Sequence, residues 1–402
     1  MNGRLENRRI LLGVTGGIAA YKACEVLRRL QREGAEIRVV MTAAAQKFMT
    51  PLTFETLSRN EVVTEMFPEH RTVKTRHVQW AEWAECILIC PATLNCIGKT
   101  ASGIADDFLT TVIAASRCPV VFAPAMDCQM AGNSAFLSNC EKLKSLGYGL
   151  VPFESGELAS GAEGPGRLAK PERILDGVRA SLVGTKRLKG FKVLVTAGPT
   201  AEPIDPVRFI SNRSSGRMGL ALAEEAALRS AEVTLVTGAR FPHVMDGIRC
   251  LTVDTAREMA ETVRVEWERH DVLIAAAAVA DYRPATVSRQ KIKKDSDALL
   301  LNLERTEDVL QQASSVKGDR VVVGFALETE NGVANALRKL QGKDLDLVCL
   351  NNPLEPGSGF YTETNRITLI GRDQSVQELP LMPKWDAARS ILDAVETLMK
   401  NR

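Results

Sequence analysis

The segment of residues 191–219 constrains the fold more than any other part of this 402-residue chain. An apolar, β-rich run at 193–195 breaks at Gly198, and a second polar, glycine-rich loop leads into the helical pattern LALAEEAALRS. A strand, a glycine loop and a helix N-terminus form an anion site, because loop amides and the helix dipole both favour negative charge. The long insert between strand and helix carries four side chains suited to anions: Arg208, Asn212, Arg213 and Arg217. The segment therefore predicts a site for a phosphate and a second anionic group.

Apolar strands and amphipathic helices alternate through both halves of the chain. RRILLGVTG, AEIRVVMT and CILICPAT predict strands of the first half, and AEVTLVTG, DVLIAAAAVADY and DRVVVGFALET predict strands of the second. Continuous apolar strands separated by helices indicate parallel sheets covered on both faces. The alternation restarts after a basic link near residue 185. The sequence thus predicts an α/β protein of two domains, residues 1–185 with a doubly wound parallel sheet and residues 186–402 with a Rossmann-like sheet.

Composition limits the classes of partner. The net charge is +2, so anionic ligands must be met by local clusters, and no general attraction to nucleic acid is expected. No run of 18 apolar residues and no signal-peptide core occurs, so we expect neither a membrane span nor secretion. Nine cysteines without a CxxC pair indicate buried thiols in a reducing cytosol. A cytoplasmic enzyme acting on small molecules is expected.

Small residues at several strand ends of the first half predict a cofactor site. Gly16 and Gly17 follow the first strand and open a helix, which alone is a weak signal because glycines also simply end strands. Hydroxyl side chains stand at or after further strand ends, at Thr42, Thr93 and Ser102. Such loops lie together at the carboxyl edge of a parallel sheet. They fit a planar ring with a phosphate tail, as in a flavin.

Five motifs resemble one family of enzymes: GVTGGIAAYK, RHVQWAEWAE, PATLNCIGKTASGIADD, APAM and SGELASG with GPGR. The chain resembles, over essentially its whole length, the flavin-dependent phosphopantothenoylcysteine decarboxylases that bacteria fuse to phosphopantothenate–cysteine ligase for coenzyme A synthesis. The resemblance implies a flavodoxin-like FMN domain with His77 as catalytic histidine and Met126 and Gly156 at the substrate. It also implies a homo-oligomer with trimeric decarboxylase and dimeric ligase contacts. A surface histidine at a helix start is the alternative for His77.

Two positions depart from that family. Asp127 stands where the resemblance implies an asparagine on the substrate carboxylate, and Ser160 stands where it implies a proton-donating cysteine. A hydroxyl is a far weaker acid than a thiol, and an ionised Asp127 would repel a carboxylate unless burial raised its pKa enough to keep its proton. Two interpretations remain open. One is a variant decarboxylase with Ser160 or Asp127 as its acid, and the other is an impaired or regulatory flavin-binding half beside an active ligase.

In the second half the resemblance implies that CTP activates the carboxylate of 4′-phosphopantothenate as an acyl-cytidylate, which the amine of cysteine then attacks. Arg208 and Asn212 would bind phosphopantothenate and the intermediate, and Lys291 would bind the CTP phosphates. The remaining nucleotide contacts implied are Ala277, Ala278, Asp281, Phe325, Lys339 and Lys343. Asp281 is the expected Mg²⁺ contact.

Some signals in this half are weaker. A KIKK run such as residues 291–294 is more often a solvated basic patch, and lysines on a helix are mostly solvated. Residues 306–309 read Thr-Glu-Asp-Val where the family commonly has Asn-Pro-Asp-Ile. An NAD-dependent reductase is disfavoured, because a GxGxxG motif with an acidic residue ending the second strand is missing from the sequence.

Overall fold

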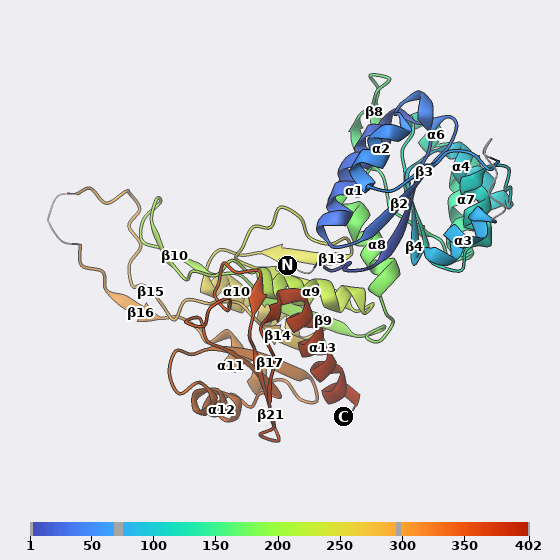
Figure 1. Ribbon diagram of the computed structural model, residues 1–402. Helices are drawn as coiled ribbons and strands as arrows, with labels where there is room; N and C mark the ends of the chain where they lie inside the picture. Colours follow the sequence, from blue (N-terminus) through green and yellow to red (C-terminus); the bar gives the residue numbers. More distant parts are fainter. Residues whose placement is uncertain (1–2, 68–74, 295–298, 401–402) are drawn as a thin grey trace. The chain divides into compact units, whose positions relative to one another are not determined.

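The first unit, residues 1–184, is built on a six-stranded parallel sheet in the computed structural model (Figure 1). The structure describes residues 3–67, 75–294 and 299–400 of the chain. The strands are β1 (Arg9–Val14), β2 (Glu36–Met41), β3 (Val62–Val63), β4 (Cys86–Ala92), β5 (Val120–Pro124) and β6 (Gly149–Leu150). Their order is β3-β2-β1-β4-β5-β6. Without the two-residue edge strand β3, this is the 2-1-3-4-5 order of flavodoxin-like sheets.

Helices cover both faces of this sheet because its strands are apolar on both sides. In α1 (Ala23–Arg32) the buried residues Val26, Leu27 and Leu30 recur at helical spacing and pack with α8 (Pro171–Val183) on one face. The second face is covered by α3 (Arg76–Trp83), α4 (Leu94–Ser102), α5 (Phe108–Ala115) and α7 (Ser134–Ser145). Shorter pieces are η1 (Ile18–Lys22), η2 (Ala45–Lys47), α2 (Pro51–Ser58) and α6 (Cys128–Ala131). Of these, η1 and η2 are 3₁₀ helices.

The second unit, residues 185–402, is built on an eight-stranded sheet. Its strands, in spatial order, are β13 (Ile248–Thr252), β12 (Glu232–Thr237), β9 (Lys192–Ala197), β14 (Val272–Ala275), β17 (Val321–Leu327), β18 (Leu347–Asn351), β20 (Thr368–Gly371) and β21 (Val376–Glu378). The first six are parallel and follow the Rossmann order 3-2-1-4-5-6. Strand β20 pairs antiparallel with β18, and β21 pairs antiparallel with β20. The predicted fold classes of both halves are confirmed.

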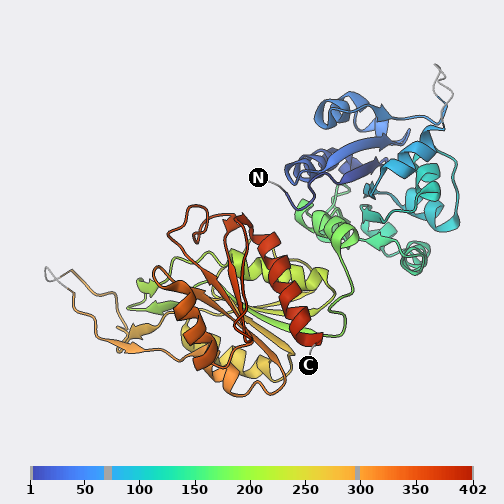
Figure 2. The same cartoon turned by 60° about the horizontal axis from the view of Figure 1, so that its bottom comes forward.

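Helices again cover both faces of the second sheet. On one face α9 (Arg217–Leu228) packs with the final helix α13 (Lys384–Lys400), the red helix that crosses the sheet in Figure 2. On the other face lie α10 (Ala256–Trp267), α11 (Val309–Ser315) and α12 (Gly332–Gly342). The indole of Trp267 is fully packed there and donates to the carbonyl of Ala313 at 2.9 Å. These layers hold the carboxyl ends of the strands in fixed positions.

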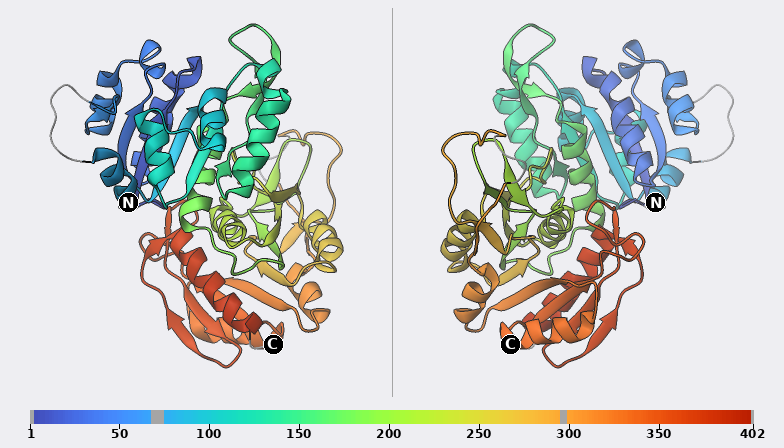
Figure 3. Two further views of the ribbon diagram at one scale, coloured as in Figure 1. Left: turned by 90° about the vertical axis from the view of Figure 1, so that its right-hand side faces the viewer. Right: turned by 90° about the vertical axis from the view of Figure 1, so that its left-hand side faces the viewer.

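Two-stranded ribbons project from both sheets. The hairpin of β7 (Glu154–Glu157) and β8 (Glu163–Arg167) stands out from the first unit (Figure 3). In the second unit β10 (Ala201–Pro203) pairs with β11 (Phe209–Ser211), and β15 (Tyr282–Pro284) pairs with β16 (Leu303–Arg305). These last two ribbons run outward side by side in Figures 1 and 2, and we call them the two arms. A small ribbon joins β19 (Thr364–Asn365) to β22 (Met382–Pro383). Within the described residues no helix is long and apolar enough to cross a membrane.

Candidate functional site

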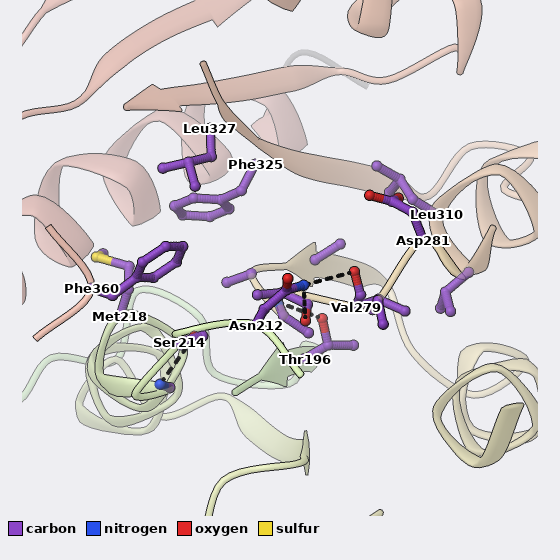
Figure 4. Close-up of a pocket in the computed structure, with 18 of the residues that line it drawn as sticks. Thr196, Asn212, Ser214, Met218, Val279, Asp281, Leu310, Phe325, Leu327 and Phe360 are labelled. Carbon is purple, nitrogen blue, oxygen red and sulfur yellow. Dashed lines mark hydrogen bonds between the residues drawn. The ribbon is translucent and has the colours of Figure 1, made fainter. Parts of the chain in front are cut away.

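A cavity of about 1120 Å³ lies in the second unit at the carboxyl ends of β9 and β14. Strands β12 and β13 extend the sheet on one side of β9, and β14, β17 and β18 extend it on the other side, so the strand order reverses between β9 and β14. The connecting loops diverge there, and doubly wound folds bind ligands in the resulting crevice. The cavity walls come from the N-terminus of α9, the loop after β14, the end of β17 and the starts of α11 and α13 (Figure 4).

Glycines bring the start of α9 close to the end of β9. A side chain at Gly219 would meet Cβ of Ala197 at 2.4 Å, so only glycine allows this contact between helix and strand. Gly216 is the N-cap of α9 and has a φ of 73°, a left-handed conformation that favours glycine. Because the first amides of a helix have no partner within it, the cavity wall at Gly216 carries donors for an anion. The predicted anion site at this glycine loop therefore has the geometry that such a site needs.

Asn212 connects this loop to the neighbouring strand. Its amide Nδ2 donates to the carbonyl oxygens of Ala278 at 3.0 Å and of Val279 at 3.2 Å. The loop after β14 is held from below by two threonines, because Thr196 accepts from the amide of Ala277 at 3.2 Å and Thr200 accepts from that of Ala280 at 2.9 Å. Side-chain hydrogen bonds thus fix both loops where they line the cavity.

One wall of the cavity combines an aromatic ring with two lysines. Phe325 of β17 faces the interior in Figure 4, and Lys339 of α12 donates to its carbonyl oxygen at 2.6 Å. Burial lowers the pKa of Lys339, and the nearby Lys343 lowers it further. Lys343 binds the carboxylate of Asp308 at 2.5 Å. Burial opposes ionisation of Asp308, but the hydrogen bond from Lys343 lowers its pKa overall. The wall formed by Phe325, Lys339 and Lys343 can bind an aromatic base together with negatively charged groups.

Cationic groups also line the cavity beside the start of α9. Arg217 is the first residue of α9, and Lys384 is the first residue of α13. Lys384 is 6% exposed, and burial lowers its pKa to about 8. Ser215 donates to the carbonyl oxygen of Phe360 at 2.7 Å, which brings a distant loop against the same wall. Two positive charges and a helix N-terminus therefore converge here.

In the first unit, glycine and threonine residues lie together where the strand order reverses between β1 and β4. The hydroxyl of Thr15 is buried, donates to the carbonyl of Pro91 at 2.7 Å and accepts from the amide of Thr93 at 3.0 Å. A Cβ on Gly16 would lie 2.3 Å from Cβ of Ala44, in the loop after β2. Three strand ends thus form one edge with exposed backbone, as a dinucleotide or flavin site requires.

The hairpin of β7 and β8 touches the segment after β5. Ser160, near the hairpin tip, donates to Oδ2 of Asp127 at 2.6 Å, and the amide of Met126 donates to the carbonyl of Gly166 at 2.9 Å. Cys128 lies 3.6 Å from the other carboxylate oxygen of Asp127. The hydrogen bond from Ser160 lowers the pKa of Asp127, which is partly exposed. The suggestion that burial raises this pKa and keeps Asp127 protonated is therefore wrong for this arrangement.

Comparisons with known proteins cover both units. A family model described as Flavoprotein matches residues 1–183, and one described as DNA/pantothenate metabolism flavoprotein C-terminal domain matches residues 188–399. The coenzyme A biosynthesis bifunctional protein CoaBC of Bacillus subtilis (strain 168) is 41% identical and is covered over 98% of each chain. The chain belongs to the CoaBC family.

Two further proteins are similar to this chain. A protein named cysteine/cysteine sulfinic acid decarboxylase, from an unknown prokaryotic organism, is 44% identical over 87% of this chain and 99% of that protein. A solved C-terminal domain of a CoaBC protein is 37% identical, with a TM-score of 0.48 over 54% of this chain and 100% of that domain.

The structure brings most residues of the ligase prediction to one cavity. Its lining includes Asn212, Ala277, Ala278, Asp281, Phe325, Lys339 and Lys343. Lys291 and Arg208 are outside that lining and lie on the arms. Arg208 pairs with Asp205 at 2.6 Å and donates to the carbonyl of Ile292 at 3.0 Å. The roles of Lys291 and Arg208 stay predictions.

The flavin prediction is also met only in part by position. Gly16, Gly17, Thr42 and Thr93 lie in the loops at the ends of β1, β2 and β4. Ser102 is exposed and ends α4, about 13 Å along the helix from Thr93. His77 is half-buried in the first turn of α3. The catalytic role of His77 stays a prediction.

Sequence reasoning missed several residues that the structure adds. Thr15 and Ser215 bind segments 76 and 145 positions away in sequence, and Lys384 binds a loop 25 positions before it. The sequence signal for Lys384 is weak: it is a lysine at the first position of an amphipathic helix, and its burial is known only from the structure. Among the described residues no group of three or more His, Cys, Asp or Glu side chains could hold a metal. A metal contact at Asp281 would therefore need ligands from a bound substrate, as Mg²⁺ with a triphosphate usually has.

Proposed function

We propose that the second unit joins 4′-phosphopantothenate to cysteine at the expense of CTP, and that the first unit decarboxylates the product, phosphopantothenoylcysteine, with FMN. One observation carries the ligase half: a single cavity is lined by a helix N-terminus with cations and by an aromatic ring with two lysines. Such a cavity suits two anionic substrates that must react with each other. The family membership supports both halves.

The ligase reaction would use the cavity in two steps. In the first, a carboxylate oxygen of phosphopantothenate attacks the α-phosphorus of CTP, and pyrophosphate leaves. In the second, the amine of cysteine attacks the acyl carbon, loses a proton, and CMP leaves. The phosphate of phosphopantothenate would lie at Gly216 and Arg217, and the cytosine would stack on Phe325, with Lys339 and Lys343 on its phosphates. Fixed donors in a cavity stabilise the charge that develops in both steps without reorganising.

The first unit fits FMN at the edge formed by Thr15, Gly16, Thr42 and Thr93. Because Gly16 has no side chain, the backbone approaches closely there, and hydroxyl groups are available for a phosphate and a ring. Bound FMN would accept the electrons of the substrate thiol, which makes loss of carbon dioxide possible, and would return them afterwards. His77 would act as a proton acceptor during this oxidation.

The chain's own clamp would close over the substrate. Met126 and Gly156 lie on the two segments that Ser160 and Asp127 join, so the hairpin can cover a substrate placed beside the β5 end. The hydroxyl of Ser160 donates a hydrogen bond to Asp127 in this arrangement. Ser160 would give its proton to the substrate in the last step and would regain one from water.

A second candidate reaction for the first unit is decarboxylation of free cysteine. The partly exposed carboxylate of Asp127 has a lowered pKa and is ionised near neutral pH, so it attracts an ammonium and repels a carboxylate. Free cysteine carries an ammonium, whereas phosphopantothenoylcysteine has an amide in its place. The relative named cysteine/cysteine sulfinic acid decarboxylase supports this candidate. The regulatory alternative has no comparable support, since these relatives are named for catalysis or biosynthesis.

One substrate competition distinguishes the two decarboxylations. Purified protein with FMN is given phosphopantothenoylcysteine and cysteine together, and released carbon dioxide is assigned by isotopic label on each carboxyl group. Our proposal predicts release from phosphopantothenoylcysteine first. Preferential release from cysteine, reversed by Asp127→Asn, would establish the second candidate instead.

Further features of the proposal rest on the same family. Exposed apolar residues on the arms, such as Val207 and Phe209, support contact between ligase units of two copies. Exposed Tyr21 and Leu52 support a contact between first units, with three copies there. We also propose Mg²⁺ on the CTP phosphates with Asp281 as its contact, and a cytoplasmic location. Light scattering would measure the assembly, and omission of Mg²⁺ would test the metal.

A further inference from the structure

A loop of residues 357–365, which we call the strap, closes one end of the ligase cavity. Gly359 and Phe360 of the strap line the cavity, and Figure 4 shows Phe360 beside Met218 of α9. The strap's carbonyl groups are bound by side chains from two helix starts. Ser215 donates to the carbonyl of Phe360 at 2.7 Å, and Lys384 donates to that of Gly359 at 3.3 Å. The strap is therefore seated by hydrogen bonds from the wall that would hold a phosphate.

Arg217 makes the third of these contacts, and it differs from the others because it includes an ion pair. Its Nη1 donates to the carbonyl of Tyr361 at 3.3 Å and to Oε1 of Glu363 at 2.5 Å. Arg217 lines the cavity, whereas Glu363 is not among the lining residues. The side chains of the pair are 47% and 49% exposed. A carboxylate of the protein thus occupies the arginine that stands at the N-terminus of α9.

An anion at the start of α9 would compete with Glu363 for Arg217. Exposed ion pairs are weak, so a ligand that binds the helix amides and the guanidinium together can displace the carboxylate. Glu363 would then return to water, since half of its side chain is already exposed. A dianion gains more from Arg217, Lys384 and the helix dipole than a singly charged group, while both must displace the same carboxylate.

From this competition, we propose that Glu363 is a positioning residue of the ligase reaction, a built-in carboxylate that holds Arg217 until the substrate phosphate displaces it and thereby lowers the affinity for that phosphate. The inference rests on the proposed function, because it takes the phosphate of phosphopantothenate as the displacing group. It adds a role for a residue that no sequence motif singles out. Its consequence is that Glu363 weakens the binding of every anion that must take Arg217 from it, and leaves ligands that do not use Arg217 unaffected.

The size of the effect follows from the strength of the ion pair. Exposed pairs contribute an amount equivalent to about a 1.4- to 5-fold change in an equilibrium constant. The apparent affinity for phosphopantothenate equals the intrinsic affinity multiplied by the fraction of molecules in which Arg217 is not paired with Glu363. Removing the carboxylate should therefore tighten phosphopantothenate binding by about 1.4- to 5-fold at low salt, and less at high salt.

The test measures binding of phosphopantothenate by calorimetry, without CTP or cysteine, in the full-length protein. Glu363→Gln should tighten binding by the stated factor, and KM should fall while kcat stays unchanged. The matched control is Glu355→Gln, which removes a carboxylate that pairs with Arg366 at 3.6 Å in the segment just before the strap, outside the cavity lining. It should change nothing. If Glu363→Gln does not fold, Glu363→Asp keeps the charge but shortens the reach, and should tighten binding in part.

A double-mutant cycle identifies the route of the effect. Arg217→Gln should weaken phosphopantothenate binding, and adding Glu363→Gln to that variant should then have no effect. Weaker or unchanged binding in Glu363→Gln, or tightening that persists without Arg217, would overturn the inference. A wild-type protein that forms no amide with CTP would instead refute the proposed function. In that case titration with inorganic phosphate still tests whether Glu363 and an anion compete for Arg217.

Discussion

Asn212→Asp perturbs the ligase cavity at one atom, because it replaces the donor Nδ2 by an oxygen. That nitrogen donates to two carbonyl oxygens, of Ala278 at 3.0 Å and of Val279 at 3.2 Å. The aspartate would place a negative charge against both carbonyls and beside the substrate phosphates. We therefore expect the loop at residues 212–216 to leave its productive position and handling of the acyl-cytidylate to fail.

The magnitude follows from the two hydrogen bonds. Each is worth about 0.5–1.5 kcal/mol net, so losing both costs about 1–3 kcal/mol, equivalent to an about 5- to 150-fold loss of amide formation. Because Asn212 is exposed, water replaces part of the loss in Asn212→Ala, which should lie near the lower limit. The added charge should move Asn212→Asp towards the upper limit.

The assay follows pyrophosphate release and amide formation separately, with CTP, phosphopantothenate and cysteine in excess. Amide formation should fall more than pyrophosphate release, with the thermal unfolding temperature unchanged. Asn133→Asp is the matched control, because Asn133 caps α7 through its oxygen, which aspartate also has. Wild-type amide formation by Asn212→Asp, or an equal loss in the control, would refute this reasoning.

Four further outcomes are expected. Lys291→Gln should lower pyrophosphate release from CTP by about 10²- to 10³-fold if this lysine reaches the α-phosphate, and an unchanged rate would remove it from the site. Gly16→Val should abolish FMN binding, because a side chain there meets Ala44 at 2.3 Å, and the flavin absorbance of the purified protein measures this. Lys384 has a pKa of about 8 and is charged below it, so KM for phosphopantothenate should rise as pH passes from 7 to 9, and a flat profile would contradict its role. Ser160→Cys should speed flavin reoxidation in anaerobic stopped-flow without changing decarboxylation, whereas indifference to the thiol would show that Ser160 suffices as donor.

The sequence predicts the sheets well because their strands are continuous and apolar. The run CILICPA forms a fully buried strand, and Gly198 and Gly216 occur where the backbone needs a left-handed conformation. Strand ends that follow from this pattern lie together, so Asn212 and Phe325 reach one cavity. Local sequence determines these features, and the local sequence therefore reveals them.

Contacts between distant segments are not visible in this way. Arg217 and Glu363 are 146 positions apart, and the strap that carries Glu363 follows no periodic pattern. Ser102 was selected for its hydroxyl, yet the length of α4 carries it away from Thr93. A protonated Asp127 would need burial that raises its pKa, and only the structure shows that this carboxylate is partly exposed and accepts a hydrogen bond from Ser160.

The central claim is that one chain makes phosphopantothenoylcysteine and then decarboxylates it. The most direct measurement incubates the purified protein with FMN, Mg²⁺, phosphopantothenate, cysteine and CTP, and follows products by mass. The account predicts the amide together with CMP and pyrophosphate, followed by a species lighter by one carbon dioxide. Absence of the amide, with CTP unconsumed, would contradict it.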